Sequence, residues 1–191
     1  MTGVQTCALP ISIRSFSFAP LDIPLFEPFG ISGGAQPAAN NVLTTIELTD
    51  GTRGYGEAAP LPPYNGETQA DALRALQAAQ PWIVGQPIEA WRELAHRFRE
   101  LAGARCGSAQ CALEMALLDA MCRQRGQSMT QFFGGASSTL ETDMTVTTGS
   151  AAEAAAAARS IRARGIRMIK VKVGGAKGVA HDLEQIGRAH V

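Results

Sequence analysis

The stretch Ile166–Gly175, IRMIKVKVGG, decides how the second part of this chain folds. In an extended strand the residues alternate between two faces, so Lys170 and Lys172 project from the same face. Ile169 and Val171 project from the other face, and a β-branched apolar face is typical of a strand covered by helices. We therefore expect a parallel strand whose carboxyl end carries both lysines. In α/β folds, the loops at that end form the ligand site.

Lysine is rare in this chain, which has three lysines and fourteen arginines. Arginine keeps its proton in proteins, whereas a lysine beside a second cation can lose its proton and act as a base near neutral pH. This favours Lys172 as a base, with Lys170 as the neighbour that promotes its neutral form. The same residues also fit an edge strand with a solvated lysine face, and the strand alone does not separate the two interpretations.

The composition is that of a soluble globular protein, with 46% apolar residues and a formal net charge of zero. The charge balance gives no reason to expect a nucleic-acid partner, and no apolar run approaches the roughly 20 residues that cross a bilayer. The four cysteines lack the spacing of a zinc site or a disulfide framework. Cys111 and Cys122 lie in a helical pattern, and we expect them to be core thiols in a reducing cytoplasm.

Alternation of apolar and polar residues predicts three strands in the first third of the chain, at residues 13–18, 42–49 and 52–57. Asp50-Gly51 between the last two is a strong hairpin signal, so these strands should form an antiparallel meander. Residues 24–41 are rich in glycine, proline and alanine. They predict a long functional loop between the first two strands.

Helical patterns dominate the middle of the chain. A first helix is predicted to begin near Glu67. A second carries an apolar stripe formed by Ile88, Trp91, Leu94, Phe98 and Leu101. Residues Ser108–Arg125 predict an apolar helix, and a short helix after it ends at Gly134-Gly135.

A strand, a helix and a second strand follow. Residues 141–148 alternate, Ser150 and Glu153 form the capping box that opens a helix over residues 150–164, and residues 166–173 alternate again. This order predicts one βαβ unit with a parallel sheet.

Taken together, these parts resemble the enolase superfamily, specifically the muconate lactonizing enzyme subgroup and its dipeptide epimerases. The matching stretches are Pro28-Phe29 in the predicted loop, GYGEAAPLPPYNGET at 54–68, CALEMALLDA at 111–120, FFGG at 132–135, TDMTV at 142–146 and KVK at 170–172 followed by Val-Gly.

The resemblance implies an α+β capping domain, an antiparallel meander plus helices, over residues 13–138. Residues 139–186 would then be the first βαβ unit of a truncated (β/α) TIM-type barrel, with two of its eight strands. Residues 1–12 and 187–191 fit neither pattern, and we expect them to be a non-native leader and tail.

In such families a metal-assisted reaction removes the α-proton of a carboxylate substrate and passes through an enediolate. The resemblance implies that Lys172 is the base and that Lys170 helps to neutralise the carboxylate. Thr145, Phe29, Gly30 and Tyr64 would contact the substrate. The cofactor would be Mg²⁺, with its ligands beyond residue 191, and the chain alone would therefore be inactive.

The implied reaction is epimerisation of a dipeptide or N-acyl amino acid by an isomerase, which would be a homo-oligomer when intact. Because the loop at residues 29–36 contains no Arg or Lys, we expect a substrate with an uncharged or hydrophobic side chain. A muconate-type cycloisomerase and an o-succinylbenzoate synthase start from the same intermediate and remain open. So do a Schiff-base lyase using Lys172 and a non-catalytic fragment of the capping domain.

Overall fold

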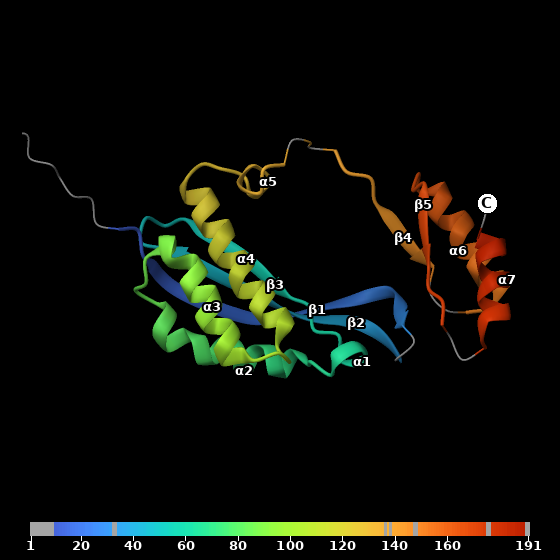
Figure 1. Ribbon diagram of the computed structural model, residues 1–191, viewed down its shortest axis with the longest axis horizontal. Coiled ribbons are helices and arrows are strands. Elements are labelled where there is room, and N and C mark those ends of the chain that lie inside the picture. The colour runs from blue at the N-terminus through green and yellow to red at the C-terminus, as the bar shows by residue number, and fades with distance from the viewer. Residues whose placement is uncertain are drawn as a thin grey trace, which may run out of the picture. The chain divides into compact units, whose positions relative to one another are not determined.

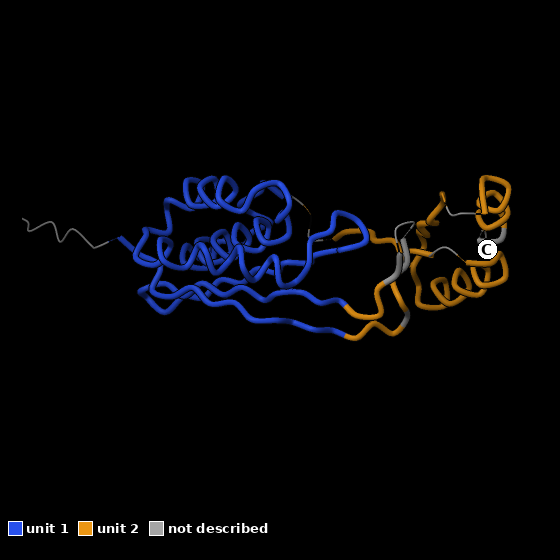
Figure 2. Tube along the Cα trace, turned by 90° about the horizontal axis from the view of Figure 1, so that it is seen from below, with its two compact units in different colours: residues 1–23, 39–136 blue, residues 24–38, 137–191 orange. Residues whose placement is uncertain are grey.

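A computed structural model of the chain describes residues 10–31, 34–135, 137, 139–146, 149–174 and 177–189. In chain order, the elements are β1 Ile13–Ile31, β2 Gly34–Leu48, β3 Arg53–Ala58, α1 Pro62–Asn65, α2 Gln69–Ile83, the 3-10 turn η1 Ile88–Ala90, α3 Trp91–Ala102, α4 Gly107–Gln124, α5 Met129–Phe132, β4 Asp143–Val146, α6 Ala151–Ala163, β5 Met168–Val171 and α7 Val179–Ala189 (Figure 1). They form two compact units, residues 1–23 with 39–136 and residues 24–38 with 137–191 (Figure 2).

The first sheet is a three-stranded meander in the order β1-β2-β3. Strands β2 and β3 pair antiparallel, with Val42 opposite Ala58, and the turn between them is closed by a hydrogen bond from the Leu48 N–H to the Thr52 carbonyl at 2.8 Å. Gly51 in this turn has a φ of 89°, which glycine adopts without strain. The hairpin predicted at Asp50-Gly51 is confirmed.

The predicted loop at residues 24–41 is wrong, because β1 runs on to Ile31 and β2 begins at Gly34. Strand β1 is an edge strand, where Pro24 and Pro28 can lie without removing a hydrogen bond from the sheet. Strand β3 ends at Ala58, opposite Val42, so the sheet continues past that point as a ribbon of β1 and β2. Strand pairing here outweighs a composition that is typical of loops.

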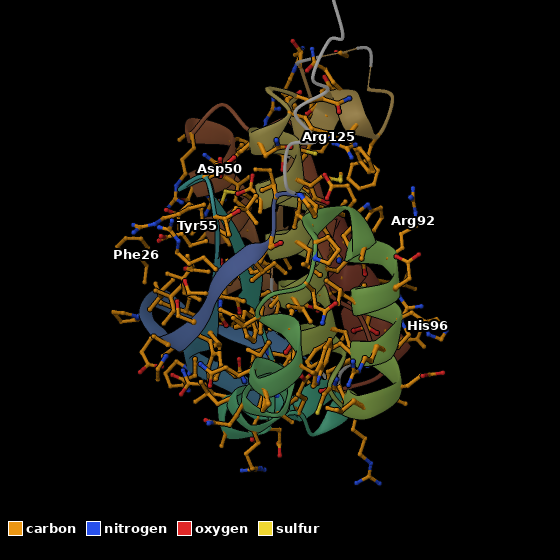
Figure 3. The ribbon with its side chains drawn as sticks, turned by 90° about the vertical axis from the view of Figure 1, so that its left-hand side faces the viewer. Phe26, Asp50, Tyr55, Arg92, His96 and Arg125 are labelled. Carbon is orange, nitrogen blue, oxygen red and sulfur yellow. The ribbon has the colours of Figure 1, made fainter. Side chains whose placement is uncertain are left out.

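Helices α2, α3 and α4 cover one face of this sheet (Figure 1), and the core lies between the two layers. Its fully buried large side chains include Ile13, Val42, Ile46, Leu48, Leu76, Ile83, Ile88, Phe98, Leu113 and Leu117. The residues of β3 alternate between exposed and buried, and Tyr55 lies on the outer face (Figure 3).

Strand β3 and helix α4 approach closely at two glycines. A Cβ atom on Gly56 would lie 1.9 Å from the carbonyl oxygen of Ala112, and one on Gly54 would lie 2.2 Å from the backbone nitrogen of Ala120. Both positions therefore require glycine so that the helix backbone can lie directly on the strand. Asp119 of α4 accepts a hydrogen bond from the Tyr55 N–H at 3.0 Å, so the helix also provides a partner for a backbone N–H at the outer edge of β3.

A buried carboxylate closes the other end of α4. Glu67 is 3% exposed, and its side chain accepts hydrogen bonds from the Ser108 hydroxyl at 2.7 Å and the Ser108 N–H at 3.1 Å. Cys106, at the N-cap, makes no side-chain capping bond among the described residues. Glu67 thus supplies the acceptor and the negative charge that a helix N-terminus favours, from a segment distant in sequence.

Two residues expected in the core, Cys111 and Leu101, lie at the surface. Cys111 is exposed, whereas Cys122 is buried as predicted, and burial raises the pKa of its thiol. The side of α4 that faces the sheet carries Ala112 and Ala116, and Cys111 lies outside it. Leu101, in the last turn of α3, is 47% exposed, so the predicted apolar stripe ends at Phe98. Within the described ranges, no helix has the length and apolar composition to cross a bilayer.

The second unit contains the predicted βαβ unit. Strands β4 and β5 pair parallel, with Met144 opposite Ile169, and α6 lies between them in the chain. Val146, Ala154 and Ile161 form a small core against which Ile169 packs. The βαβ prediction is confirmed, although both strands are shorter than predicted.

Gly56→Ala should lower the free energy of unfolding by at least about 2 kcal/mol, because the added methyl group would overlap the backbone of α4. Gly107→Ala is the matched control. Nothing lies within 4 Å of a Cβ at this position in the first turn of α4, so this variant should be neutral or more stable by up to about 1 kcal/mol. Urea unfolding followed by circular dichroism measures both, and equal effects of the two variants would contradict the close approach.

The capping box of α6 should make this helix sensitive to acid. Hydrogen bonds from Ser150 lower the pKa of Glu153 below its usual value. The Ser150 N–H has the larger effect and the Ser150 hydroxyl the smaller one. A lowered pKa in the folded state stabilises the fold above the unfolded-state pKa, and this stability is lost as the pH falls through the folded-state pKa. The stability difference between wild type and Glu153→Gln should therefore be full at neutral pH and disappear in acid. A Ser150→Ala background keeps the Ser150 N–H but removes the hydroxyl, so the difference should shrink at neutral pH without vanishing; an unchanged difference would argue against the hydroxyl bonds of the capping box.

Candidate active site

The two lysines and Thr145 lie on neighbouring parallel strands. Thr145 of β4 is the register partner of Lys170 of β5. The Lys172 N–H donates to the Val146 carbonyl at 3.0 Å, so the pairing continues past the end of β5. Because paired residues of a sheet project to the same face, Thr145 and Lys170 share a face, and Lys172 follows two residues later on that face.

This face lies opposite the small core of the second unit. Ile169 is partly buried against that core, while Lys170 is exposed and Lys172 is partly buried. The alternation predicted from sequence is thus present in β5, but it does not extend to Val173, which is 53% exposed.

Phe29 is brought to Lys172 from the far end of β1. The Nζ atom of Lys172 lies 5.8 Å from the centroid of the Phe29 ring, and both residues belong to the second unit. Gly30 follows Phe29 in β1. Tyr64 is 79% exposed on α1 of the first unit, and its place at the substrate stays a prediction. The roles of the other five residues also stay predictions.

Helix α7 contacts the backbone at Gly149, after β4, and at Gly174, after β5. The Gly149 carbonyl accepts a hydrogen bond from Gln185 Nε2 at 2.7 Å and lies 2.7 Å from His181 Nε2. Buried Asp182 accepts a hydrogen bond from the Gly174 N–H at 2.9 Å. Sequence reasoning missed these three residues. The spacing of four between His181 and Gln185 places both on one helix face, but their partner is a backbone carbonyl that the sequence does not reveal.

The side chains near the lysines do not suit a magnesium ion. Besides the two amines and the Thr145 hydroxyl, this face carries one carboxylate, Asp143 at the start of β4, whereas Mg²⁺ prefers a set of several oxygen ligands. Within the described parts of the chain, no group of three or more His, Cys, Asp or Glu side chains could hold a metal. Ligands beyond residue 191 stay a prediction.

Comparison with known proteins places this geometry in a family. Residues 17–134 match the N-terminal domain of the mandelate racemase / muconate lactonizing enzyme family. An aromatic dipeptide epimerase of Herpetosiphon aurantiacus is 46% identical over 186 residues, which cover 95% of this chain and 51% of that protein. A hydrophobic dipeptide epimerase of Citrifermentans bemidjiense is 38% identical over 79% of this chain and 42% of its own length.

Solved structures agree. A mandelate racemase/muconate lactonizing protein from Herpetosiphon aurantiacus has a TM-score of 0.89 and 45% identity, covering 96% of this chain and 51% of its own. A dipeptide epimerase from Cytophaga hutchinsonii, complexed with Mg and D-Ala-L-Val, has a TM-score of 0.85 and 28% identity, covering 95% of this chain and 48% of its own.

The chain spans about half the length of the curated relatives it matches. The predicted α+β capping fold, a strand meander with helices, is confirmed by the match over residues 17–134 and by the fold of the first unit. The chain therefore belongs to the mandelate racemase / muconate lactonizing enzyme family of the enolase superfamily.

Proposed function

We propose that the intact protein is an isomerase that epimerises dipeptides, and that Lys172 removes the α-proton of the substrate. The observation that carries this proposal is the shared face of Lys170, Lys172 and Thr145 at the carboxyl ends of two parallel strands. Names of relatives add support, since those at 46% and 38% identity are dipeptide epimerases. The same fold can host other reactions, so the residues and not the fold carry the argument.

Lysine suits this chemistry. A proton next to a carboxylate is very weakly acidic, and its removal needs a base as well as positive charge where the new negative charge develops. Lys172 Nζ would accept the proton, and Lys170 would lie beside the developing charge. Thr145, opposite Lys170, would help to orient the substrate with a neutral hydroxyl.

In the proposed reaction a metal ion takes part, and residues outside this chain would bind it. Solved dipeptide epimerases from Cytophaga hutchinsonii and Methylococcus capsulatus are complexed with Mg and a dipeptide. We infer that the intact protein also uses Mg²⁺, which would neutralise charge on the substrate carboxylate. Its ligands would lie beyond residue 191, so the chain alone should be inactive.

We propose that the protein prefers dipeptides with an apolar side chain. Residues 29–36 contain no Arg or Lys that could pair with an acidic substrate, and Phe29 contributes an aromatic ring beside Lys172. The two relatives cited above are named for aromatic and hydrophobic dipeptides.

The longer protein that contains this chain should exchange the substrate α-proton in deuterated water. Lys172→Ala should lower that exchange by about 100-fold to 10,000-fold, the contribution of a general base. Lys177→Ala, which changes an exposed lysine after β5, is the control and should keep wild-type exchange. The 191-residue chain itself should show no exchange. Full exchange in Lys172→Ala would rule out the proposed base.

The substrate preference can be measured directly on the same protein. We expect kcat/KM for alanyl-phenylalanine to exceed that for alanyl-glutamate by at least about tenfold, because burying an unpaired carboxylate is costly. Adding an arginine in the ribbon, as in Gln36→Arg, should raise kcat/KM for the glutamate dipeptide, whereas Gln36→Leu should not. A clear preference of the wild type for alanyl-glutamate would refute the proposed specificity.

A further inference from the structure

Phe29 and Phe26 are two aromatic residues on the same strand with different surroundings. The Phe29 ring centroid lies 5.8 Å from Lys172 Nζ, inside the roughly 6 Å over which a ring face attracts an ammonium group. Phe26 lies three residues earlier, hence on the opposite face of β1. It is fully exposed, and its side chain projects away from the ribbon (Figure 3). Strand β1 thus presents Phe29, which is 37% exposed, toward Lys172, and Phe26 to solvent alone.

Lys172 has few competing partners. Lys170 is the charged residue that precedes it on the same face, and like charges do not attract. None of the ion pairs formed among the described residues involves Lys172. The Phe29 ring is thus an aromatic partner for an ammonium group that forms none of these ion pairs.

We propose that Phe29 is a positioning residue for Lys172. Its ring holds the protonated amine by a cation–π contact and ties residues 24–38 of the ribbon to β5. A neutral amine lacks this attraction, so the contact is specific for an ammonium group. The catalytic meaning of this device rests on the proposed function, in which Lys172 gains a proton, but the contact itself can be tested without turnover.

Ring electrostatics, and not bulk, should determine the contact. Indole attracts a cation more strongly than phenyl does, whereas leucine offers a similar apolar surface with no π face. The order expected for strength of contact is therefore Phe29→Trp at or above wild type, and Phe29→Leu well below it. Phe26→Leu removes a ring of the same strand from the opposite face and is the matched control.

Because the chain has three lysines, labelling them with ¹³C at Cε gives three signals that can be assigned by substitution. We expect the Lys172 signal of the 191-residue chain to show an upfield ring-current shift that Phe29→Leu abolishes. Phe29→Trp and Phe26→Leu should keep the shift. The signals of Lys170 and Lys177 should stay unchanged in all three variants, which also reports that the fold is intact.

Acylation of the lysines, followed by mass spectrometry, is the second measurement. Phe29→Leu should speed modification of Lys172 by about twofold to fivefold, the factor that corresponds to a contact of about 0.5–1 kcal/mol, relative to Lys177 in the same molecule. A Lys172 signal and acylation rate that Phe29→Leu leaves unchanged would overturn the proposal. Failure of proton exchange in the intact protein, with these two results as expected, would instead overturn the proposed function alone.

Discussion

Strand β3 and helix α4 touch through their backbones, and the rest of the first unit is arranged around that contact. With Gly54 and Gly56 on the strand and alanines on the helix, no side chain separates β3 from α4 at these two positions. The short distance allows Asp119 to reach the Tyr55 N–H at the edge of the sheet. At the other end of the helix, buried Glu67 binds Ser108 and fixes the segment before α2. Helix α4 is thus held along its length and at its N-terminus.

Signals between residues close in sequence were sufficient to predict much of this fold. The Asp50-Gly51 turn, the capping box of Ser150 and Glu153, and the alternation around Lys170 each depend on residues a few positions apart. The ribbon over residues 24–41 could not be predicted in this way, since its strands are stabilised by pairing and its composition is that of a loop. Glu67 was missed for a similar reason, because its partner Ser108 lies on a distant element.

In the candidate site, too, local sequence patterns predicted some residues and missed those that depend on contacts between distant elements. Alternation placed Lys170 and Lys172 on one face, whereas Thr145 was predicted through family resemblance, and its pairing with Lys170 is seen in the structure. Phe29 entered only through resemblance to a family, because nothing local in the sequence links it to Lys172. His181 and Gln185 escaped notice because their common partner is a backbone carbonyl, which carries no sequence signal. Contacts to backbone atoms are therefore the part of such a site that sequence patterns reveal least.

The ribbon of β1 and β2 differs from the rest of the first sheet in one respect. None of the described side chains of residues 24–38 is buried, whereas the parts of both strands that adjoin the helices carry Ile13, Phe16 and Val42 in the core. Substitutions in the ribbon therefore leave the packing between the layers intact. Natural selection could alter the ribbon's chemistry through successive single changes, each tolerated by the fold, while Gly54 and Gly56 stay invariant. A lineage built on this scaffold could therefore vary the surface of the ribbon without altering the architecture of the first unit.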